Sequence, residues 1–441
     1  MSGSLISHID RFFGITARGS SIRTEILAGL TTFLSMCYIL VVNPAMLMVA
    51  GVPFGDAVWA TIISACAGTL LIGLYANRPY VVAPIVSQST LVVYVLCGVL
   101  NYPWRAVLGA SLVAGLLFSL FIVSGYWDIF IKSIPGTISR SCTRGIGFFI
   151  AFLGSSNSGI ILVGAMAVTS PYLRDIQPSN LFVLLAGITV IGVIMIRKKT
   201  GALICGILTC ALLAYALGIE KLPTDIVTAP PAFSGLQWYP DIAAVLTPTM
   251  IPVVVLLFFL TLFDSIASIF GLSSLIHQNE EPRDNSDIRR SFLTNGLSMM
   301  VSPLVGCTTS AIFIESVAGV EEGGKTGLVA VVAAVLIAAS LFFLPLVTAF
   351  PDVATSAVLL VIGLLMLAQF RIPSLSSRGE MLTAFVLMVT MSITQNIGLG
   401  LSIGIIVYPL FMFAAGKQSE IPRVFWGLVV CAAIFLVIFP Y

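Results

Sequence analysis

The sequence predicts an all-helical, polytopic membrane protein, because its composition, its apolar runs and the placement of its basic residues agree. Of 441 residues, 58% are hydrophobic and only 9% are charged, and the mean hydropathy is +1.08. A soluble core of this size cannot bury so much apolar surface. Many apolar stretches are long enough to cross a hydrocarbon layer of about 30 Å as helices, and they lack the alternation of membrane β-strands.

These apolar stretches predict fourteen core spans and one further apolar helix near 423–439. The core spans are expected at 26–49, 57–75, 81–100, 106–123, 144–163, 180–196, 201–217, 248–276, 291–306, 309–321, 326–348, 354–369, 380–396 and 398–415.

The basic residues predict which side of the membrane each loop faces. With the N-terminus in the cytoplasm, 18 of the 21 basic residues lie on the cytoplasmic side, and only Arg105, Arg174 and Lys221 lie outside. The positive-inside rule expects this asymmetry, and it requires an even number of spans before Lys417. Residues 1 to 25 are polar and amphipathic, so we expect a cytoplasmic N-terminus rather than a cleaved signal peptide.

The proline-containing connection 218–247 divides the core spans into two groups of seven. Residues 1–217 then form a first repeat, residues 248–415 a second repeat, and residues 416–441 a C-terminal helix. An odd number of spans in each repeat makes the two repeats antiparallel, as in inverted-repeat transporters. The connection itself is expected on the extracytoplasmic side.

Two spans at corresponding positions of the repeats are interrupted by polar and helix-breaking residues. They are RPYVVAPIVSQST (78–90) in the third span and GCTTSAIFIESVAGVEEGGKTG (306–327) in the tenth. Non-helical backbone survives at membrane depth only where protein or a wet cavity satisfies it. We therefore expect these segments to meet and to form a binding site. The EEGGKTG part lacks the GxxxxGK[ST] spacing of a phosphate loop.

Glu315 and Asp264 are carboxyl groups inside predicted spans. The dipole at a helix N-terminus contributes up to about 1 kcal/mol, less than the roughly 3 kcal/mol cost of a charge at the bilayer centre. Each acid therefore needs a partner, a proton or a ligand. Glu315 is interpreted as a ligand for a solute or coupling ion, with a structural hydrogen bond as the alternative.

Helical spacing places Asp264 on one face with Thr261, Ser265 and Ser268. This polar stripe is expected to face protein or water rather than lipid, with helix packing as the alternative. In the first span, Tyr38 lies on a polar face that either packs or lines a cavity.

The third span adds a polar run of Ser87, Gln88, Ser89 and Thr90 after Pro84. Gln88 offers both a donor and an acceptor, which suits the edge of a planar heterocycle. The alternative is a helix cap.

Other classes of function are disfavoured by the residues. The eight cysteines form no CxxC pair and mostly lie in apolar runs, which predicts buried packing rather than metal or disulfide chemistry. No nucleophile and base set, metal cluster or soluble catalytic domain is recognisable, so we expect neither an enzyme nor a cofactor. The net charge of +2 comes without a basic patch, and no nucleic-acid partner is expected.

Four stretches resemble the nucleobase/ascorbate transporter superfamily, specifically its AzgA-like purine permease branch. They are RTEILAGLTTFLSMCYILVVNP near the start, IPGTISRSCTRGIGFFIAFLGSSNSGI at 134–160, LFDSIAS at 262–268 and GCTTSAIFIESVAGVEEGGKTGL at 306–328. The resemblance covers essentially the whole chain. The branch usually has a pattern close to APGMGLNAFFAY in span three, whereas this chain has APIVSQSTLVVY at 83–94.

The resemblance implies a core domain of spans 1–4 and 8–11 moving against a gate domain of spans 5–7 and 12–14, with short strands in spans three and ten. It implies proton-coupled transport of adenine, guanine or hypoxanthine, with Asp264 and Glu315 as the family's acids in spans eight and ten. Dimers are common among relatives, which allows a homodimer.

We therefore expect a secondary active transporter of the cell inner (plasma) membrane that takes up a purine nucleobase or a similar planar solute. Asp264 and Glu315 are expected to bind the solute and couple protons, since a carboxyl group at the midplane is far cheaper neutral than charged. Na⁺ is also compatible as the coupling ion. The other expected solute ligands are Ser87, Gln88, Ser89, Phe313, Tyr38 and Ser268. The alternatives are a carrier of another organic solute or anion, and a non-transporting membrane sensor.

Overall fold

The computed structural model describes residues 2–124, 134–158, 161–162, 172–173, 178–197, 202–221, 225, 227–233, 240–276, 285–345, 351–368, 378–394 and 396–438. Six basic residues that contribute to the predicted topology lie outside these ranges, namely Lys132, Arg174, Lys198, Lys199, Arg283 and Arg371.

The first predicted repeat consists mainly of helices. Its elements are α1 (Ser2–Phe13), α2 (Ile22–Met36), α3 (Ile39–Val49), α4 (Phe54–Leu71), the π-helical turn η1 (Ile72–Ala76), β1 (Val82–Pro84), α5 (Val86–Thr90), the π-helical segment η2 (Leu91–Val99), α6 (Trp104–Val123), α8 (Gly136–Asn157), β2 (Ile161–Leu162), β3 (Tyr172–Leu173), α9 (Pro178–Ile196) and α10 (Ala202–Ala216).

The connection and the second predicted repeat follow the same pattern, with a strand just before the tenth predicted helix. The elements are α11 (Ile242–Val245), α12 (Ile251–Ile276), α13 (Asn285–Leu304), β4 (Ser310–Ile312), the 3-10 turn η3 (Ile314–Ser316), α14 (Val317–Glu321), α15 (Gly327–Ala339), α17 (Asp352–Ala368), α18 (Arg378–Ile393), α19 (Ile397–Ala414), η5 (Gln418–Glu420) and α20 (Phe425–Ile438).

Each predicted span overlaps one of these elements, and the largest differences have local causes. The first span is divided into α2 and α3 at Cys37 and Tyr38. Helix α8 begins at Gly136, before the predicted start at 144, because its first turns are polar and hydropathy does not register them. Helix α15 ends at Ala339 rather than near 348. A turn follows at residues 340–342, and residues 344–345 are helical again.

Six helical stretches of the described chain are long and apolar enough to cross a membrane. They are Ile22–Val49, Phe54–Ala76, Trp104–Val123, Pro178–Ile196, Ile251–Ser273 and Ile397–Ala414, and shorter apolar helices accompany them. The chain is therefore a helical, multi-pass membrane protein.

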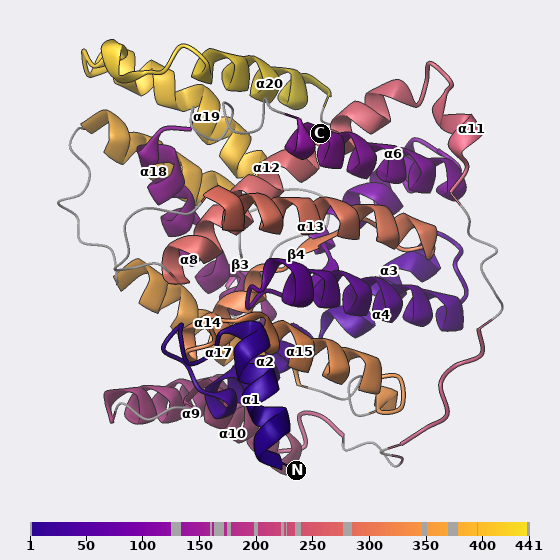
Figure 1. The fold of residues 1–441 in the computed structure, drawn as a ribbon, viewed down its shortest axis with the longest axis vertical. Coiled ribbons are helices and arrows are strands. Elements are labelled where there is room, and N and C mark those ends of the chain that lie inside the picture. Colours follow the sequence, from indigo (N-terminus) through magenta and orange to yellow (C-terminus); the bar gives the residue numbers. More distant parts are fainter. Residues whose placement is uncertain are drawn as a thin grey trace.

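The helices form a bundle with α12 and α13 near its middle (Figure 1). Helix α13 packs against α4 and α6, and α12 packs against α6, α8 and α19. Helices α9 and α10 pair at one end of the view, while α19 and α20 pair at the opposite end (Figure 1).

The two interrupted segments meet as a short antiparallel ribbon. Strand β1 pairs with β4 in the register Val82 to Ile312, Ala83 to Ala311 and Pro84 to Ser310. All six residues are buried. A two-stranded ribbon with three residues in each strand is not stable alone, so the surrounding helices must support it. The prediction that short strands occur in spans three and ten is confirmed.

Candidate functional site

Glu315 lies just after the ribbon, where β4 turns into η3. The hydroxyl of Tyr38 donates a hydrogen bond of 2.6 Å to its Oε1 atom. Its Oε2 atom is buried and has no hydrogen-bond partner in the described part of the chain. Tyr38 comes from the break between α2 and α3, and its ring centroid lies 6.2 Å from that of Phe313. The structure thus brings three predicted site residues together: Tyr38, Phe313 and Glu315.

The backbone that carries Glu315 is fixed by bonds to the third span. The Phe313 amide donates to the Val81 carbonyl at 2.8 Å, and the Val81 amide donates to the Ser316 hydroxyl at 2.9 Å. Glu315 therefore occupies a defined position even though only half of its carboxyl group is satisfied. A buried polar atom without a partner calls for an explanation such as a water or a ligand.

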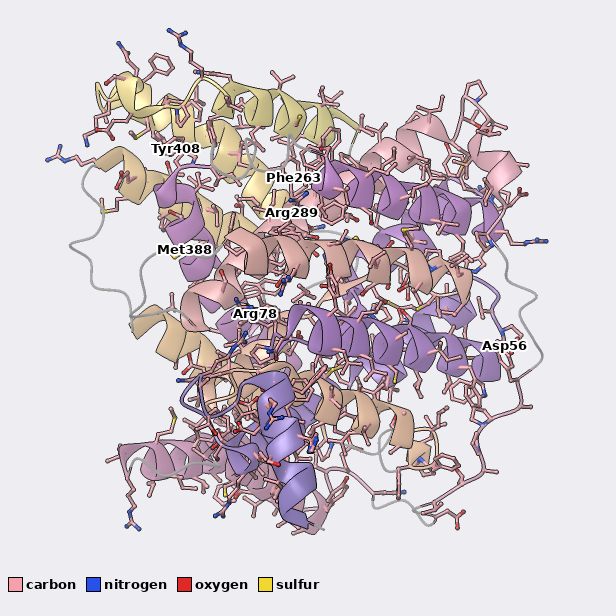
Figure 2. The ribbon with its side chains drawn as sticks, in the orientation of Figure 1. Asp56, Arg78, Phe263, Arg289, Met388 and Tyr408 are labelled. Carbon is pink, nitrogen blue, oxygen red and sulfur yellow. The ribbon has the colours of Figure 1, made fainter. Side chains whose placement is uncertain are left out.

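Asp264 lies in the middle of α12 and is 5% exposed. No hydrogen bond or ion pair reaches its carboxyl group from the described residues. The preceding residue, Phe263, points toward α20, with its ring centroid 5.6 Å from that of Phe435 (Figure 2). Ser268 is buried one turn further along α12.

Helix α12 contacts β4, η3 and α14, so the helix that carries Asp264 packs on the segment that carries Glu315. No hydrogen bond joins the two carboxyl groups in the described part of the chain. A shared chamber between them stays a prediction. A cavity of about 240 Å³ lies elsewhere, between the end of α3, η2 and the start of α6, and it is lined partly by Tyr94, Tyr102 and Trp104.

The polar residues of the third span differ in their hydrogen bonding. The Gln88 side chain is 1% exposed, and neither its Oε1 nor its Nε2 atom has a partner among the described residues. Ser89, in contrast, is satisfied by protein. Its hydroxyl donates to Asn43 Oδ1 at 3.0 Å and shares a 2.7 Å hydrogen bond with Thr308. The side chain of Ser87 lies outside the described part of the chain.

Sequence reasoning missed a buried hydroxyl and amide network beside the ribbon. Asn43 also donates to Thr61 at 2.8 Å. Ser64 is 2.6 Å from both Ser302 and Ser310. These bonds connect α3, α4, α13 and β4. The Asn43-Pro44 pair and the serines of α13 were the available signals, but their partners are distant in sequence.

The two broken segments carry groups of the kinds that bind small polar solutes. Glu315 Oε2 offers an acceptor, Gln88 offers a donor and an acceptor, and the rings of Tyr38 and Phe313 offer apolar surface. Broken helices that pair inside a bundle of membrane-length helices are typical of membrane transporters.

The fold and this site define a polytopic membrane protein of transporter type. Two solved structures share the fold at low sequence identity. The transmembrane domain of a cyanobacterial bicarbonate transporter, BicA, matches with a TM-score of 0.55 and 15% identity, covering 86% of this chain and 97% of that one. The murine anion transporter Slc26a9 matches with a TM-score of 0.53 and 12% identity, covering 89% of this chain and 68% of that one.

The chain belongs to the Permease family (Xan_ur_permease), whose model matches residues 23–399. It is 32% identical to the guanine/hypoxanthine permease PbuO of Bacillus subtilis over 419 residues, which are 93% of this chain and 96% of that one. It is 28% identical to the adenine permease AdeP of Escherichia coli over 416 residues, which are 94% of this chain and 92% of that one. The resemblance inferred from the four sequence stretches is confirmed.

Proposed function

We propose that this protein is a secondary active transporter that takes up a purine nucleobase together with protons. The observation that carries this proposal is the half-satisfied Glu315, which sits beside Tyr38 and Phe313 where the two broken segments pair. Relatives named as guanine/hypoxanthine and adenine permeases support the class of solute.

In this proposal Glu315 and Asp264 bind the solute, and Glu315 exchanges a proton during each cycle. Taking an unpaired carboxylate out of water is costly, so a group in this position favours the neutral state until a ligand or proton acceptor is near. The Gln88 amide would complete the polar edge, with the rings of Tyr38 and Phe313 against the face of the base. Ser87, Ser89 and Ser268 would contribute further hydroxyl groups, although Ser89 must then exchange bonds it makes to protein.

We further infer the division into inverted repeats, with spans 1–4 and 8–11 as the core domain and spans 5–7 and 12–14 as the gate domain. The antiparallel pairing of β1 with β4 supports the inverted relation. The protein would lie in the plasma membrane with its N-terminus in the cytoplasm, and a homodimer is compatible with the fold.

An anion carrier is the second candidate, because the two solved structures described above, which share the fold, are named as bicarbonate and anion transporters. Two buried acids disfavour that choice, since an anion needs Arg or Lys as its counter-charge. No ion pair involves Asp264 or Glu315 among the described residues. A sensor that binds without transporting is the third candidate.

Purified protein in proteoliposomes tests the proposal directly. With an inward proton gradient, labelled guanine, hypoxanthine or adenine should accumulate, and labelled bicarbonate should not. Binding without flux would favour the sensor, while accumulation of bicarbonate alone would favour the anion carrier. A sodium gradient in place of the proton gradient identifies the coupling ion.

Two variants test the assigned acids. Glu315→Gln should abolish gradient-driven accumulation, because an amide cannot carry the proton. Asp264→Asn should weaken binding of the base. Wild-type uptake and affinity in both variants would refute the assignment.

A further inference from the structure

Asn295, on α13, lies between the two segments that carry the acids. Its side chain is fully buried. The Nδ2 atom donates a 2.7 Å hydrogen bond to the hydroxyl of Ser265, the residue after Asp264. The Oδ1 atom accepts a 2.8 Å hydrogen bond from the backbone amide of Ile312, the last residue of β4 and three residues before Glu315. One rigid amide group thus connects α12 with β4.

We propose that Asn295 is a positioning residue that fixes Asp264 and Glu315 relative to each other, so that one solute can contact both. This inference rests on the proposed function. The amide group is planar, so its oxygen and nitrogen stay a fixed distance apart. A shift of β4 against α12 would therefore break one of its two hydrogen bonds.

Thr69 is the residue in the first half of the chain that bonds to β1 as Asn295 bonds to β4. The comparison shows that Asn295 does more than accept a hydrogen bond from a strand amide. Val82 is the register partner of Ile312. Its amide donates to the hydroxyl of Thr69 on α4 at 3.0 Å, and that hydroxyl lies 3.1 Å from the Val82 carbonyl. Both bonds of Thr69 therefore go to the same residue of β1. A hydroxyl is enough to satisfy an edge amide, whereas the amide of Asn295 also reaches the helix of Asp264.

The buried setting makes the connection sensitive to substitution. Loss of the Asn295 side chain leaves the Ile312 amide without a partner, and a buried donor without a partner is costly. Strand β4 has three residues, and so short a ribbon depends on the surrounding helices. Without the Asn295 amide the ribbon loses its bonded link to α12, and Glu315 can shift with the ribbon relative to Asp264. Misplacing a binding group by about 1 Å costs up to about a hundredfold in activity.

The test compares Asn295→Ala with Thr294→Val in proteoliposomes. Thr294 is equally buried on the same helix, but among the described residues its hydroxyl donates only to the carbonyls of Arg290 and Ser291 in its own helix. Asn295→Ala should raise the KM for the transported base by about tenfold or more, with a smaller change in maximal rate. Thr294→Val should stay within about twofold of wild type, as expected for a site outside the network.

A double-mutant cycle identifies the path of the effect. If Asn295 acts through Ser265, Ser265→Ala should raise the KM in the wild type but add little to Asn295→Ala. Fully additive effects would overturn the link to α12. A lowered melting temperature with an unchanged KM in Asn295→Ala would show a merely structural residue and overturn the proposal.

Failure of the proposed function gives a different result. In that case the wild type itself neither binds nor transports guanine, hypoxanthine or adenine. Hydrogen exchange then tests the connection without a solute. The Ile312 amide should exchange faster in Asn295→Ala than in Thr294→Val, and equal rates would overturn the proposal.

Discussion

Tyr38 combines two roles that a substitution can separate. Its ring lies near Phe313, and its hydroxyl bonds to Glu315 at 2.6 Å. The sequence predicted Tyr38 as a solute ligand, but nothing in the local pattern indicated the bond to a residue 277 positions away. This bond orients one carboxyl oxygen, while the other is buried without a partner among the described residues.

Tyr38→Phe keeps the ring and removes only the hydroxyl. A hydrogen bond to a carboxyl group that becomes charged is worth about 1.5–3 kcal/mol, so we expect binding of the base to weaken by about tenfold to a hundredfold. Equilibrium binding to purified protein measures the change. Tyr75→Phe is the control, because Tyr75 is 54% exposed on η1. Equal affinity in Tyr38→Phe and wild type would mean that the hydroxyl does not prepare Glu315 for its ligand.

A second buried glutamate has a structural role between elements. Glu25, in the first turn of α2, is fully buried. Its carboxyl oxygens accept hydrogen bonds from the amides of Lys325 and Thr326 at 3.0 and 3.1 Å, and from the Thr326 hydroxyl at 2.7 Å. This carboxylate satisfies the amides of the two residues that lead into α15 and interacts favourably with the helix dipole, while Asn77 Oδ1 and the Thr326 hydroxyl accept from the first helical amides, those of Gly327 and Leu328. The EEGGKTG stretch is therefore a helix start capped by another helix.

Glu25→Ala should lower the free energy of unfolding by about 3 kcal/mol, because it leaves buried donors without partners. Glu25→Gln should cost less, since its carbonyl oxygen still accepts. Unfolding in mixed detergent micelles measures both. The control is Glu420→Ala, which removes an ion pair with Lys417 at the surface and should cost at most about 1 kcal/mol. Equal losses in Glu25→Ala and Glu420→Ala would contradict the cap.

The elements were more predictable than their contacts. Long apolar runs identify membrane helices because the bilayer sets their length, and proline and polar residues identified the two broken segments. The meeting of the two broken segments was predicted from their matching positions in the two halves, and their short strands were predicted from the family resemblance. Asn295 and Glu25 were missed because each bonds to partners that periodicity does not connect to it. Ser89 looked like a solute ligand in sequence, yet its hydroxyl already bonds to Asn43 and Thr308.

In the whole molecule, the site lies close to the proposed boundary between core and gate. Helix α12 would belong to the core and α19 to the gate, and the two pack directly together. The contact is close at Gly398, in the first turn of α19. A Cβ atom there would lie 3.1 Å from the Leu260 carbonyl oxygen and 3.3 Å from the Asp264 amide nitrogen. Because glycine has no side chain, α19 can pack closely against α12 beside Asp264, a proposed solute ligand.

Gly398→Val tests whether α12 and α19 move past each other during transport. If they do, the added side chain obstructs the movement, and the transport rate should fall about tenfold or more. Binding of the base should change less, because the bound state needs no sliding. Exchange of labelled base across proteoliposomes gives the rate, and equilibrium binding gives the affinity.

Gly192→Ala on α9 is the control, because a Cβ atom at Gly192 has nothing within 4 Å. It should leave both quantities near wild type. If Gly398→Val instead lowers rate and affinity by the same factor, α12 and α19 belong to one rigid body, and the boundary between core and gate must lie elsewhere. A normal rate would mean that this contact separates or yields during transport. The ratio of the two effects therefore decides whether the acid in α12 moves against α19.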